Sequence, residues 1–365
     1  MKTLIFSNSI WNIYNFRLDL VKEISKKDNV IIYCNLKKNF NLKKYNIPKK
    51  IRIKNIFFSS KSTNFIENFR LIYQIFKIIK KERPDNIFSF TLKPNLFCGL
   101  ISYIYQFSFF PTISGLGTAY NRGGFFFYII KLLIKISFKN SKKIFTHNIY
   151  EKFLLIKLGL NKKKIIQVNG SGIDFKKFKK LKFLKKLPNN NFLYLGRLIA
   201  DKGVNELLDA FKILEKKIHC KITLAVIIDN DNVSSMDLKV LKTKIPIKNI
   251  LVKTNVKDVK KLIKSHDCLV LPSYSEGMSR AIMEAAALGR PIICSNIFGC
   301  KEMVINGFNG FLVVPRSVKS LYNALLKFSN LSFKDKTKFG SNSRLLLKKS
   351  GFDQKGVITK YIQAI

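Results

Sequence analysis

Acidic residues are scarce in this 365-residue chain, and so is arginine. Asp and Glu number 22 against 67 Lys and Arg, which gives a formal net charge of +45 at pH 7. Such a charge is typical of proteins that bind nucleic acids, membrane surfaces or acidic polymers. Only 10 of the cations are arginine, the residue on which recognition of phosphates and base edges relies. The lysine excess therefore argues against specific nucleic-acid recognition, and with abundant Ile, Asn and Phe it is typical of an AT-rich genome.

Cysteine pairs and an export signal are also missing. The six cysteines form no C-x-x-C pair and follow no metal-ligand spacing, so we expect reduced cysteines in the core of a cytosolic protein. The first residues, MKTLIFSNSIWN, carry too short an apolar run for a signal peptide and are typical of an opening strand. We therefore predict a cytoplasmic location.

One stretch, Leu96 to Asn121, has no charged residue and is long enough to span a membrane. Pro111, Gly115 and Gly117 interrupt it. Because proline and glycine break a helix, we predict a helix, a strand and a glycine turn here instead of a membrane span.

The next segment, FFFYIIKLLIKISFKN at 125–140, spaces Lys131, Lys135 and Lys139 four residues apart. They share one helix face, with Phe, Ile and Leu around the rest, which is typical of a helix lying in a membrane interface. A helix of a domain surface with an exposed lysine stripe gives the same pattern, and both interpretations stay open. In either case we expect the N-terminal half to face the inner surface of the cytoplasmic membrane.

Short β-branched runs alternate with helical patterns in both halves of the chain. TLIFS and NVIIYC belong to the first series, FLYLG and CLVLPS to the second. Buried strands separated by helices indicate parallel sheets with crossover helices. Apolar periodicity lapses over 175–191, which indicates a domain boundary. We predict an α/β fold of two doubly wound, Rossmann-like domains facing a central cleft, 1–178 and 192–350, joined by a Lys-rich linker at 179–191.

The segment Leu271–Ser295 has the residues of a strand, a loop, a helix and a second strand. Ser279 is placed to cap a helix that begins at Arg280, and Gly289 to end it in a left-handed turn. The loop before the helix presents the backbone N–H groups of 277–280 at a helix N-terminus. Such a terminus favours an anion, and a phosphate fits this site.

Two acids lie eight positions apart in this segment, Glu276 on the loop and Glu284 within the apolar helix. A carboxylate on such a helix is costly unless it is paired. Two interpretations follow. Either Glu284 accepts hydrogen bonds from two ribose hydroxyls while Glu276 faces a sugar, or Glu284 forms a buried ion pair with a nearby cation.

A second group of candidates lies between a strand that ends at Gly196 and a helix that begins near Gly203. Arg197 and Lys202 flank this loop, at the carboxyl end of a strand, where such sheets bind ligands. Two fixed cations there are able to hold a diphosphate without a metal and to stabilise the charge on a departing phosphate. The alternative is a pair of solvated surface cations.

The triplet Asp229, Asn230 and Asp231 has the D-x-D spacing of a divalent-metal site. A polar turn rich in Asp and Asn is also expected after a strand. We therefore predict no metal and no other cofactor.

The run 196–204, GRLIADKGV, the segment LPSYSEGMSRAIMEAAALGRPIICS and the run 299–314, GCKEMVINGFNGFLVV, resemble the donor domain of family 4 glycosyltransferases. These are retaining enzymes of the GT-B fold, and Glu276 and Glu284 match their E-x7-E motif. In the first half, SIWNIYNFRLDLVKEI, TISGLGTAY and NGSGIDFKKF are similar to bacterial members that add sugars to glycans linked to undecaprenyl (polyprenyl) diphosphate. The fold also implies that 351–365 forms a C-terminal helix packed on the N-terminal domain.

The resemblance implies catalytic roles for Glu276, Arg197 and Lys202. The donor diphosphate would be bound by Arg197 and Lys202, and the ribose by Glu284. The backbone that completes the donor site would be that of Gly277, Met278 and Ser279.

On the acceptor side the resemblance implies a loop shaped by Gly115 and Gly117. Arg17 would contact an anion. His147 follows a strand and is the histidine that would face the cleft, although a histidine there is more often structural. Many relatives have a glycine-rich loop after the first strand, where this chain has Ser7–Ser9.

These features together predict a metal-independent glycosyltransferase that moves a hexose or N-acetylhexosamine from a nucleoside-diphosphate sugar, UDP-linked by preference. Its acceptor would be a lipid-linked saccharide for capsule, lipopolysaccharide or protein glycan, at the inner membrane surface. One alternative is an enzyme with a soluble acceptor. Another is a basic protein that binds RNA or an anionic polymer, which would lose affinity steeply with salt.

Overall fold

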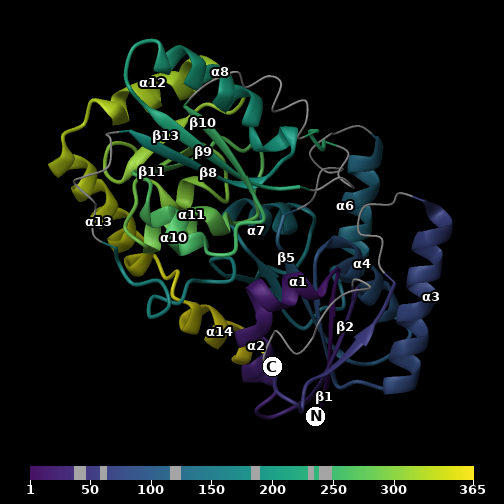
Figure 1. Cartoon of the computed structure of the whole chain (residues 1–365). Coiled ribbons are helices and arrows are strands. Elements are labelled where there is room, and N and C mark those ends of the chain that lie inside the picture. The colour runs from purple at the N-terminus through teal and green to yellow at the C-terminus, as the bar shows by residue number, and fades with distance from the viewer. Residues whose placement is uncertain (37–46, 58–63, 116–124, 182–189, 229–233, 238–248) are drawn as a thin grey trace. The chain divides into compact units, whose positions relative to one another are not determined.

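The computed structural model describes residues 1–36, 47–57, 64–115, 125–181, 190–228, 234–237 and 249–365. The chain forms two compact units (Figure 1). The first unit is Met1–Ser171 with Lys355–Ile365, and the second unit is Gly172–Gln354. The two-sheet α/β architecture predicted from the sequence is confirmed.

The first unit contains a seven-stranded parallel sheet in the order β3-β2-β1-β4-β5-β6-β7. Its strands are β1 (Lys2–Ser7), β2 (Asn29–Cys34), β3 (Arg52–Asn55), β4 (Asn86–Phe90), β5 (Ser108–Ile113), β6 (Ile144–Thr146) and β7 (Ile165–Gln167). The order reverses between β1 and β4, so the topological switch point, where open α/β sheets bind ligands, lies at the carboxyl ends of these two strands.

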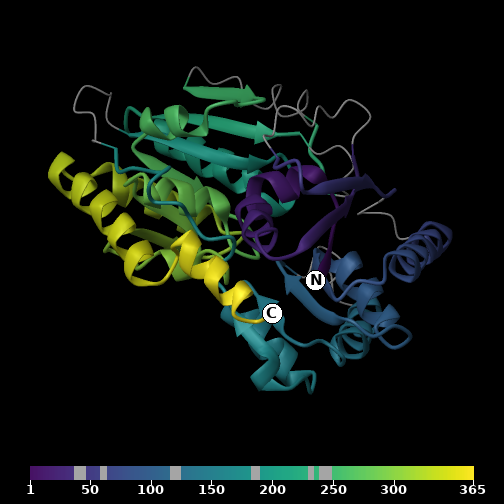
Figure 2. The ribbon, with the colours of Figure 1, turned by 90° about the horizontal axis from the view of Figure 1, so that it is seen from below.

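Helices cover both faces of this sheet. One face is covered by α3 (Phe65–Glu82), α4 (Leu92–Ile101), α6 (Phe125–Phe138) and α7 (Ile149–Lys157). The other is covered by α1 (Ile10–Asn12), the π-helical turn Ile13–Arg17, α2 (Leu18–Ile24) and α14 (Gln354–Ile362). The last helix is the yellow end of the chain in Figure 2, and its Tyr361 ring stacks on Phe145 at 3.9 Å between centroids.

The charge-free stretch of the sequence becomes α4 and β5, as predicted. Gly115 has a positive φ of 103°, and Gly117 lies outside the described residues. Among the helices that the structure describes, none is long and apolar enough to cross a membrane.

The second unit contains a six-stranded parallel sheet in the order β10-β9-β8-β11-β12-β13. Its strands are β8 (Asn191–Arg197), β9 (Lys221–Ile227), β10 (Ile250–Thr254), β11 (Cys268–Leu271), β12 (Ile292–Ser295) and β13 (Gly310–Val313). Its helices are α8 (Val204–Glu215), α10 (Val259–Lys264), α11 (Arg280–Ala287), α12 (Val318–Ser329) and α13 (Phe333–Lys349). The switch point of this sheet lies between β8 and β11, so the loops that follow these strands meet at one edge.

The first residues after the boundary are tied to the second unit by hydrogen bonds. Ile173 pairs with Asp353, and the Arg344 guanidinium donates to the carbonyl oxygens of Phe175 and Phe178. The structure therefore divides the chain between Ser171 and Gly172, whereas the sequence pattern places the end of the first domain at position 178. Long-range contacts, which local periodicity does not encode, decide this boundary.

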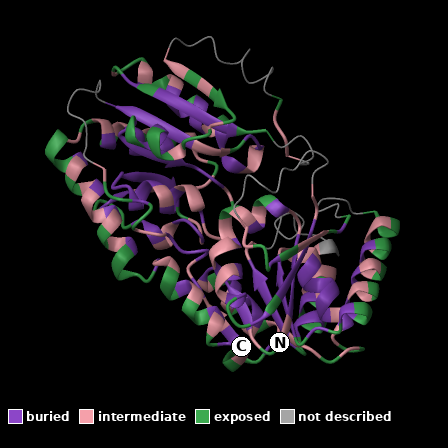
Figure 3. Cartoon of the chain, turned by 60° about the horizontal axis from the view of Figure 1, so that its bottom comes forward, coloured by how far each residue is buried: buried purple, intermediate pink, exposed green. Residues whose placement is uncertain are grey.

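The central strands form the buried core of each unit, and exposed residues gather on the helices and on the edge strands β3 and β10 (Figure 3). All six cysteines are buried and none forms a disulfide. This agrees with the prediction of reduced core cysteines.

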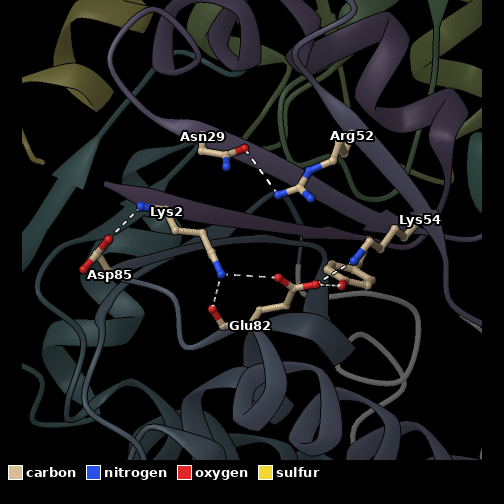
Figure 4. A network of polar contacts seen from close by, with 7 residues as sticks. Lys2, Asn29, Arg52, Lys54, Glu82 and Asp85 are labelled. Atoms are coloured by element: carbon tan, nitrogen blue, oxygen red, sulfur yellow. Dashed lines mark hydrogen bonds and ion pairs between the residues drawn. The ribbon is translucent and has the colours of Figure 1, made fainter.

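A carboxylate at the end of α3 ties that helix to the sheet of the first unit (Figure 4). Glu82 Oε1 accepts hydrogen bonds from Lys54 Nζ at 2.6 Å and from the Tyr33 hydroxyl at 2.9 Å. Lys2 Nζ lies 3.5 Å from Oε2, and its backbone N–H donates to Asp85. The Lys54 hydrogen bond is the main cause that lowers the pKa of Glu82 to about 2.

Candidate active site

Lys202 and Glu276 meet at the carboxyl edge of the second sheet, although they are 74 positions apart. Lys202 ends the short 3-10 turn Ala200–Lys202 after β8, and Glu276 lies in the loop after β11. Lys202 Nζ donates to Glu276 Oε1 at 2.5 Å, and their side chains are only 10% and 15% exposed. The Ser273 hydroxyl donates to the same oxygen at 3.0 Å. The structure thus brings together two of the three residues predicted to be catalytic.

Gly203 holds the lysine turn close to the strand edge. It adopts a left-handed φ of 68°, and a Cβ at this position would overlap the backbone carbonyl of Pro272. The backbone N–H of Tyr274 also donates to the Asp201 carbonyl at 2.9 Å. Because a side chain at 203 would force these two loops apart, glycine sets the separation of Lys202 and Glu276.

Arg197, the third predicted catalytic residue, is the last residue of β8 and is exposed. Its backbone carbonyl accepts a hydrogen bond from the Tyr194 hydroxyl at 2.8 Å. Burial raises the pKa of Tyr194, Glu276 raises it further and Arg197 lowers it. Both charged residues therefore lie within electrostatic reach of the same buried phenol.

The N-terminus of α11 is built as the sequence predicts. Ser279 is the N-cap, and its side chain accepts from the backbone N–H of Ile282. The helix ends before Gly289, which has a left-handed φ of 81°. Local signals of this kind act within a few residues, so they are legible in the sequence.

One expectation about this loop is corrected. The sequence predicts that the N–H groups of 277–280 face a ligand, but the Ser279 N–H donates to the carbonyl oxygen of Gly299 at 2.9 Å. Ser279 is also buried, whereas Gly277 and Met278 are half-buried. Backbone contact of Ser279 with a phosphate would therefore require this bond to open.

Gly299 is a residue whose role the sequence analysis missed. It lies after β12, has a φ of 86°, and a Cβ there would lie 2.6 Å from the carbonyl oxygen of Glu276 and 2.8 Å from that of Gly277. Its N–H donates to the Glu302 carboxylate at 2.8 Å. Gly299 thus packs against the backbone of the loop that carries Glu276 and holds this loop in place. The sequence did offer a signal for this role: Gly299 is the first residue of the run 299–314, which resembles the family's donor domain.

Glu284 forms the ion pair that the sequence left as one of two interpretations. Arg280 Nε donates to its Oε1 at 2.8 Å, and the two side chains are 22% and 16% exposed. Arg280 also donates to the carbonyl of Gly172 at 2.6 Å. Within the described part of the chain only Oε1 is hydrogen-bonded, so Oε2 is open to a ligand hydroxyl and the ribose interpretation is compatible with the ion pair.

The acceptor-side candidates lie at the carboxyl edge of the first sheet. Arg17 NH2 lies 2.8 Å from His147 Nε2. A guanidinium only donates, so Nε2 accepts and the ring proton is on Nδ1. Burial, and then the charge of Arg17, hold the pKa of His147 well below its usual 6.5. His147 is therefore neutral, and its Nε2 lone pair is occupied.

Glu151 connects the two remaining features of this edge. Its Oε1 accepts from the backbone N–H of Gly115 at 2.7 Å, and its Oε2 from that of His147 at 2.8 Å. It therefore fixes the start of the loop after β5. Among the described residues no group of His, Cys, Asp and Glu is arranged to hold a metal ion, and the triplet 229–231 lies outside them.

Comparison with solved structures identifies the architecture. Anabaena HepE, solved in complex with UDP, superposes with a TM-score of 0.78 at 16% identity, over 100% of this chain and 99% of that chain. At this identity the likeness shows the fold alone. Two parallel-sheet units of this kind define the GT-B class of glycosyltransferases.

Comparison of sequences then identifies the family. Residues 175–346 match the family described as glycosyl transferases group 1, and residues 3–148 match glycosyl transferase 4-like proteins. The capsular polysaccharide biosynthesis glycosyltransferase CapM of Staphylococcus aureus is 30% identical over 267 residues, which are 69% of each chain. The N,N'-diacetylbacillosaminyl-diphospho-undecaprenol alpha-1,3-N-acetylgalactosaminyltransferase of Campylobacter jejuni is 26% identical over 337 residues, 88% of this chain and 87% of that protein. The chain is a glycosyltransferase and belongs to family 4.

Proposed function

We propose that this glycosyltransferase transfers a hexose or N-acetylhexosamine from a UDP-sugar to a lipid-linked saccharide, with retention and without a metal. The observation that carries the proposal is the largely buried Lys202–Glu276 pair, supported by Ser273, beside a capped helix start. The UDP bound to HepE and the diphospho-undecaprenol substrate in the name of the Campylobacter relative support the donor and the acceptor.

Lys202 supplies the charge that a metal supplies in other transferases. Its ammonium carries three donors, and Glu276 engages it at 2.5 Å in this structure. A donor diphosphate competes for this ammonium and releases the carboxylate, which then accepts hydrogen bonds from the hydroxyls of the sugar. As the bond from the sugar C1 to the phosphate breaks, Lys202 and Arg197 stabilise the negative charge that develops on the leaving group.

Retention follows when the acceptor oxygen bonds to C1 on the face from which the diphosphate leaves. The acceptor proton passes to the departing phosphate oxygen, so atoms and charge balance without a protein base. The neutral state of His147 and its occupied Nε2 agree with this route.

The donor site is tested by calorimetric titration of UDP in excess EDTA at moderate salt. We expect saturable one-site binding that Glu284→Ala weakens at least tenfold, because the ribose loses its acceptor. Lys319→Ala, which removes a charge from α12, is the matched control and should leave UDP affinity unchanged. Absence of UDP binding, with RNA or an acidic polysaccharide adsorbing instead, would refute the donor site.

Transfer itself is tested with a panel of UDP-sugars and a saccharide linked to a short polyprenyl diphosphate. We expect EDTA to leave the rate unchanged, and NMR of the product to show the anomeric configuration of the donor. Inversion, or full dependence on added Mg²⁺ or Mn²⁺, would contradict the proposed chemistry.

We also propose that the first unit rests on the inner face of the cytoplasmic membrane. On α6 the exposed residues Tyr128, Leu132 and Ile136 follow one another at four-residue spacing, with the predicted lysines beside them. On α3 the exposed apolar residues are Phe65, Ile66, Phe69 and Tyr73, and Lys77 Nζ lies 4.4 Å from the centre of the Tyr73 ring. Both helices cover the same face of the sheet. Apolar residues flanked by lysine are typical of surfaces that bind anionic lipid.

Sedimentation with vesicles tests this surface. We expect the protein to pellet with vesicles that contain anionic phosphatidylglycerol and less with neutral phosphatidylcholine. Leu132→Glu should reduce pelleting several-fold, whereas Ile213→Glu, at an exposed apolar residue of the second unit, should not. Equal pelleting of both variants would show that the net charge alone drives adsorption.

A further inference from the structure

Arg17 is a buried cation in the first unit. It is the last residue of the π-helical turn Ile13–Arg17 and is 4% exposed. The guanidinium carbon lies 4.6 Å from the centre of the Phe90 ring. Its hydrogen-bond partners are the His147 ring and the Tyr361 hydroxyl, both of them uncharged. Arginine is seldom buried unless it is paired with an acid.

The described residues offer this cation no ion pair. Glu151, the carboxylate of the same cluster, directs both oxygens to backbone N–H groups, those of Gly115 and His147. Arg17 Nε is buried and has no hydrogen-bond partner in the part of the chain that the structure describes. A buried donor without a partner is costly, and a buried charge without a counter-charge more so. An anion bound beside Arg17 would supply both a hydrogen-bond acceptor for Nε and a counter-charge for the guanidinium.

The position of Arg17 indicates which anion. It follows β1, and its ring contact Phe90 ends β4, so Arg17 lies at the switch point of the first sheet, where such sheets bind ligands. Two further hydroxyls at the ends of these strands, Ser7 Oγ and Thr91 Oγ1, are buried and have no partner among the described residues. Thr91 has a φ of 76°. Strained backbone of this kind, and π-helical turns, concentrate at functional sites.

We propose that Arg17 is the anchor of a diphosphate-binding subsite in the first unit. A guanidinium binds two phosphate oxygens through parallel N–H donors, and the Ser7 and Thr91 hydroxyls add further donors. This chain has Ser7–Ser9 instead of a glycine-rich loop after β1, so side chains take over a contact that backbone N–H groups make in such loops. The inference rests on the proposed function, because that function supplies the two ligands that carry a diphosphate: the nucleotide sugar and the lipid-linked acceptor.

Neighbouring residues hold the guanidinium in place. Tyr361 stacks on Phe145 and its hydroxyl lies 3.3 Å from Thr112 Oγ1. The Phe90 ring supports the flat face of the guanidinium from β4. The end of the chain, through α14, thus helps to position Arg17.

Calorimetry with inorganic pyrophosphate, geranyl diphosphate and UDP tests the subsite in the full-length chain. Arg17→Met keeps the volume of the side chain and removes its charge. We expect it to lower affinity for inorganic pyrophosphate at least tenfold. Arg52→Met, which removes an exposed arginine from the same unit, should change affinity less than twofold. Equal affinities in wild type and Arg17→Met would overturn the subsite.

The other two ligands distinguish the source. A loss confined to geranyl diphosphate assigns the subsite to the lipid-linked acceptor, and a loss confined to UDP assigns it to the donor. The proposed function fails separately, if wild type does not bind UDP or if Glu284→Ala binds it normally.

Thermal unfolding separates this role from a purely structural one. A structural Arg17 predicts a lower Tm in Arg17→Met and no effect of ligand. An anion site predicts an unchanged or higher Tm, and pyrophosphate should raise the Tm of wild type but not of the variant. If Arg17→Met fails to fold, Arg17→Lys keeps the charge without the paired donors, and we expect at least threefold weaker pyrophosphate binding. Wild-type affinity in Arg17→Lys would then overturn the proposal.

Discussion

Replacement of Gly299 by alanine should impair the active site although no charged residue is replaced. The Cβ would lie 2.6 Å from the Glu276 carbonyl oxygen, whereas ordinary contact begins at 3.4 Å, so the loop must retreat by about 0.8 Å. Glu276 lies 2.5 Å from Lys202 Nζ, and a retreat of this size breaks a charge-assisted hydrogen bond, which needs about 2.7–2.9 Å. Misplacement of a catalytic group by about 1 Å costs on the order of 100-fold in rate.

We therefore expect kcat/KM for sugar transfer to fall about 100-fold in Gly299→Ala. The left-handed φ costs alanine about 1–2 kcal/mol in addition, and this must be separated from the collision. Gly307→Ala is the matched control, because Gly307 lies in the same unit, has a φ of 76° and has no atom within 4 Å of its ideal Cβ. It should lose similar stability in a thermal melt and keep its activity. Equal kcat/KM in the two variants would refute the positioning role of Gly299.

Three further predictions concern charge and burial. Removal of the cation in Lys202→Met should lower kcat at least 100-fold, measured with saturating UDP-sugar, whereas an unchanged kcat would assign Lys202 to structure. Because the folded-state pKa of Glu82 is lowered from 4.5 to about 2, its carboxylate stabilises the fold above pH 4.5 and this stabilisation is lost as the pH falls toward 2. It amounts to at most about 3 kcal/mol, and to less with screening, since Lys54 is 40% exposed. Urea unfolding at pH 6 and 3 should show a larger loss in wild type than in Glu82→Gln, and parallel losses would contradict this account. Ser279→Ala should destabilise the protein by about 1 kcal/mol through the lost helix cap, seen as a shift of the urea midpoint, and no shift would show that the cap is dispensable.

The amino-acid sequence was sufficient to predict the strands and helices that carry the site. The strand-helix alternation, the Ser279 cap and the Gly289 stop each depend on propensities and hydrogen bonds within a few residues. The same holds for the helix at 125–138, whose lysine spacing is legible directly. Periodicity also predicted two parallel sheets, because buried strands and crossover helices leave distinct patterns.

Only the tertiary structure decided which side chains meet. Lys202 and Glu276 are 74 positions apart, and Arg17 and His147 are 130 apart. No local rule predicts that Gly299 supports the Glu276 loop or that its carbonyl takes the Ser279 N–H. The sequence by itself determined the elements and the residue types available at each sheet edge, because these depend on near neighbours. The pairing of side chains and the burial of Arg17 arise from strands joined across long crossovers, so the folded chain alone decides them.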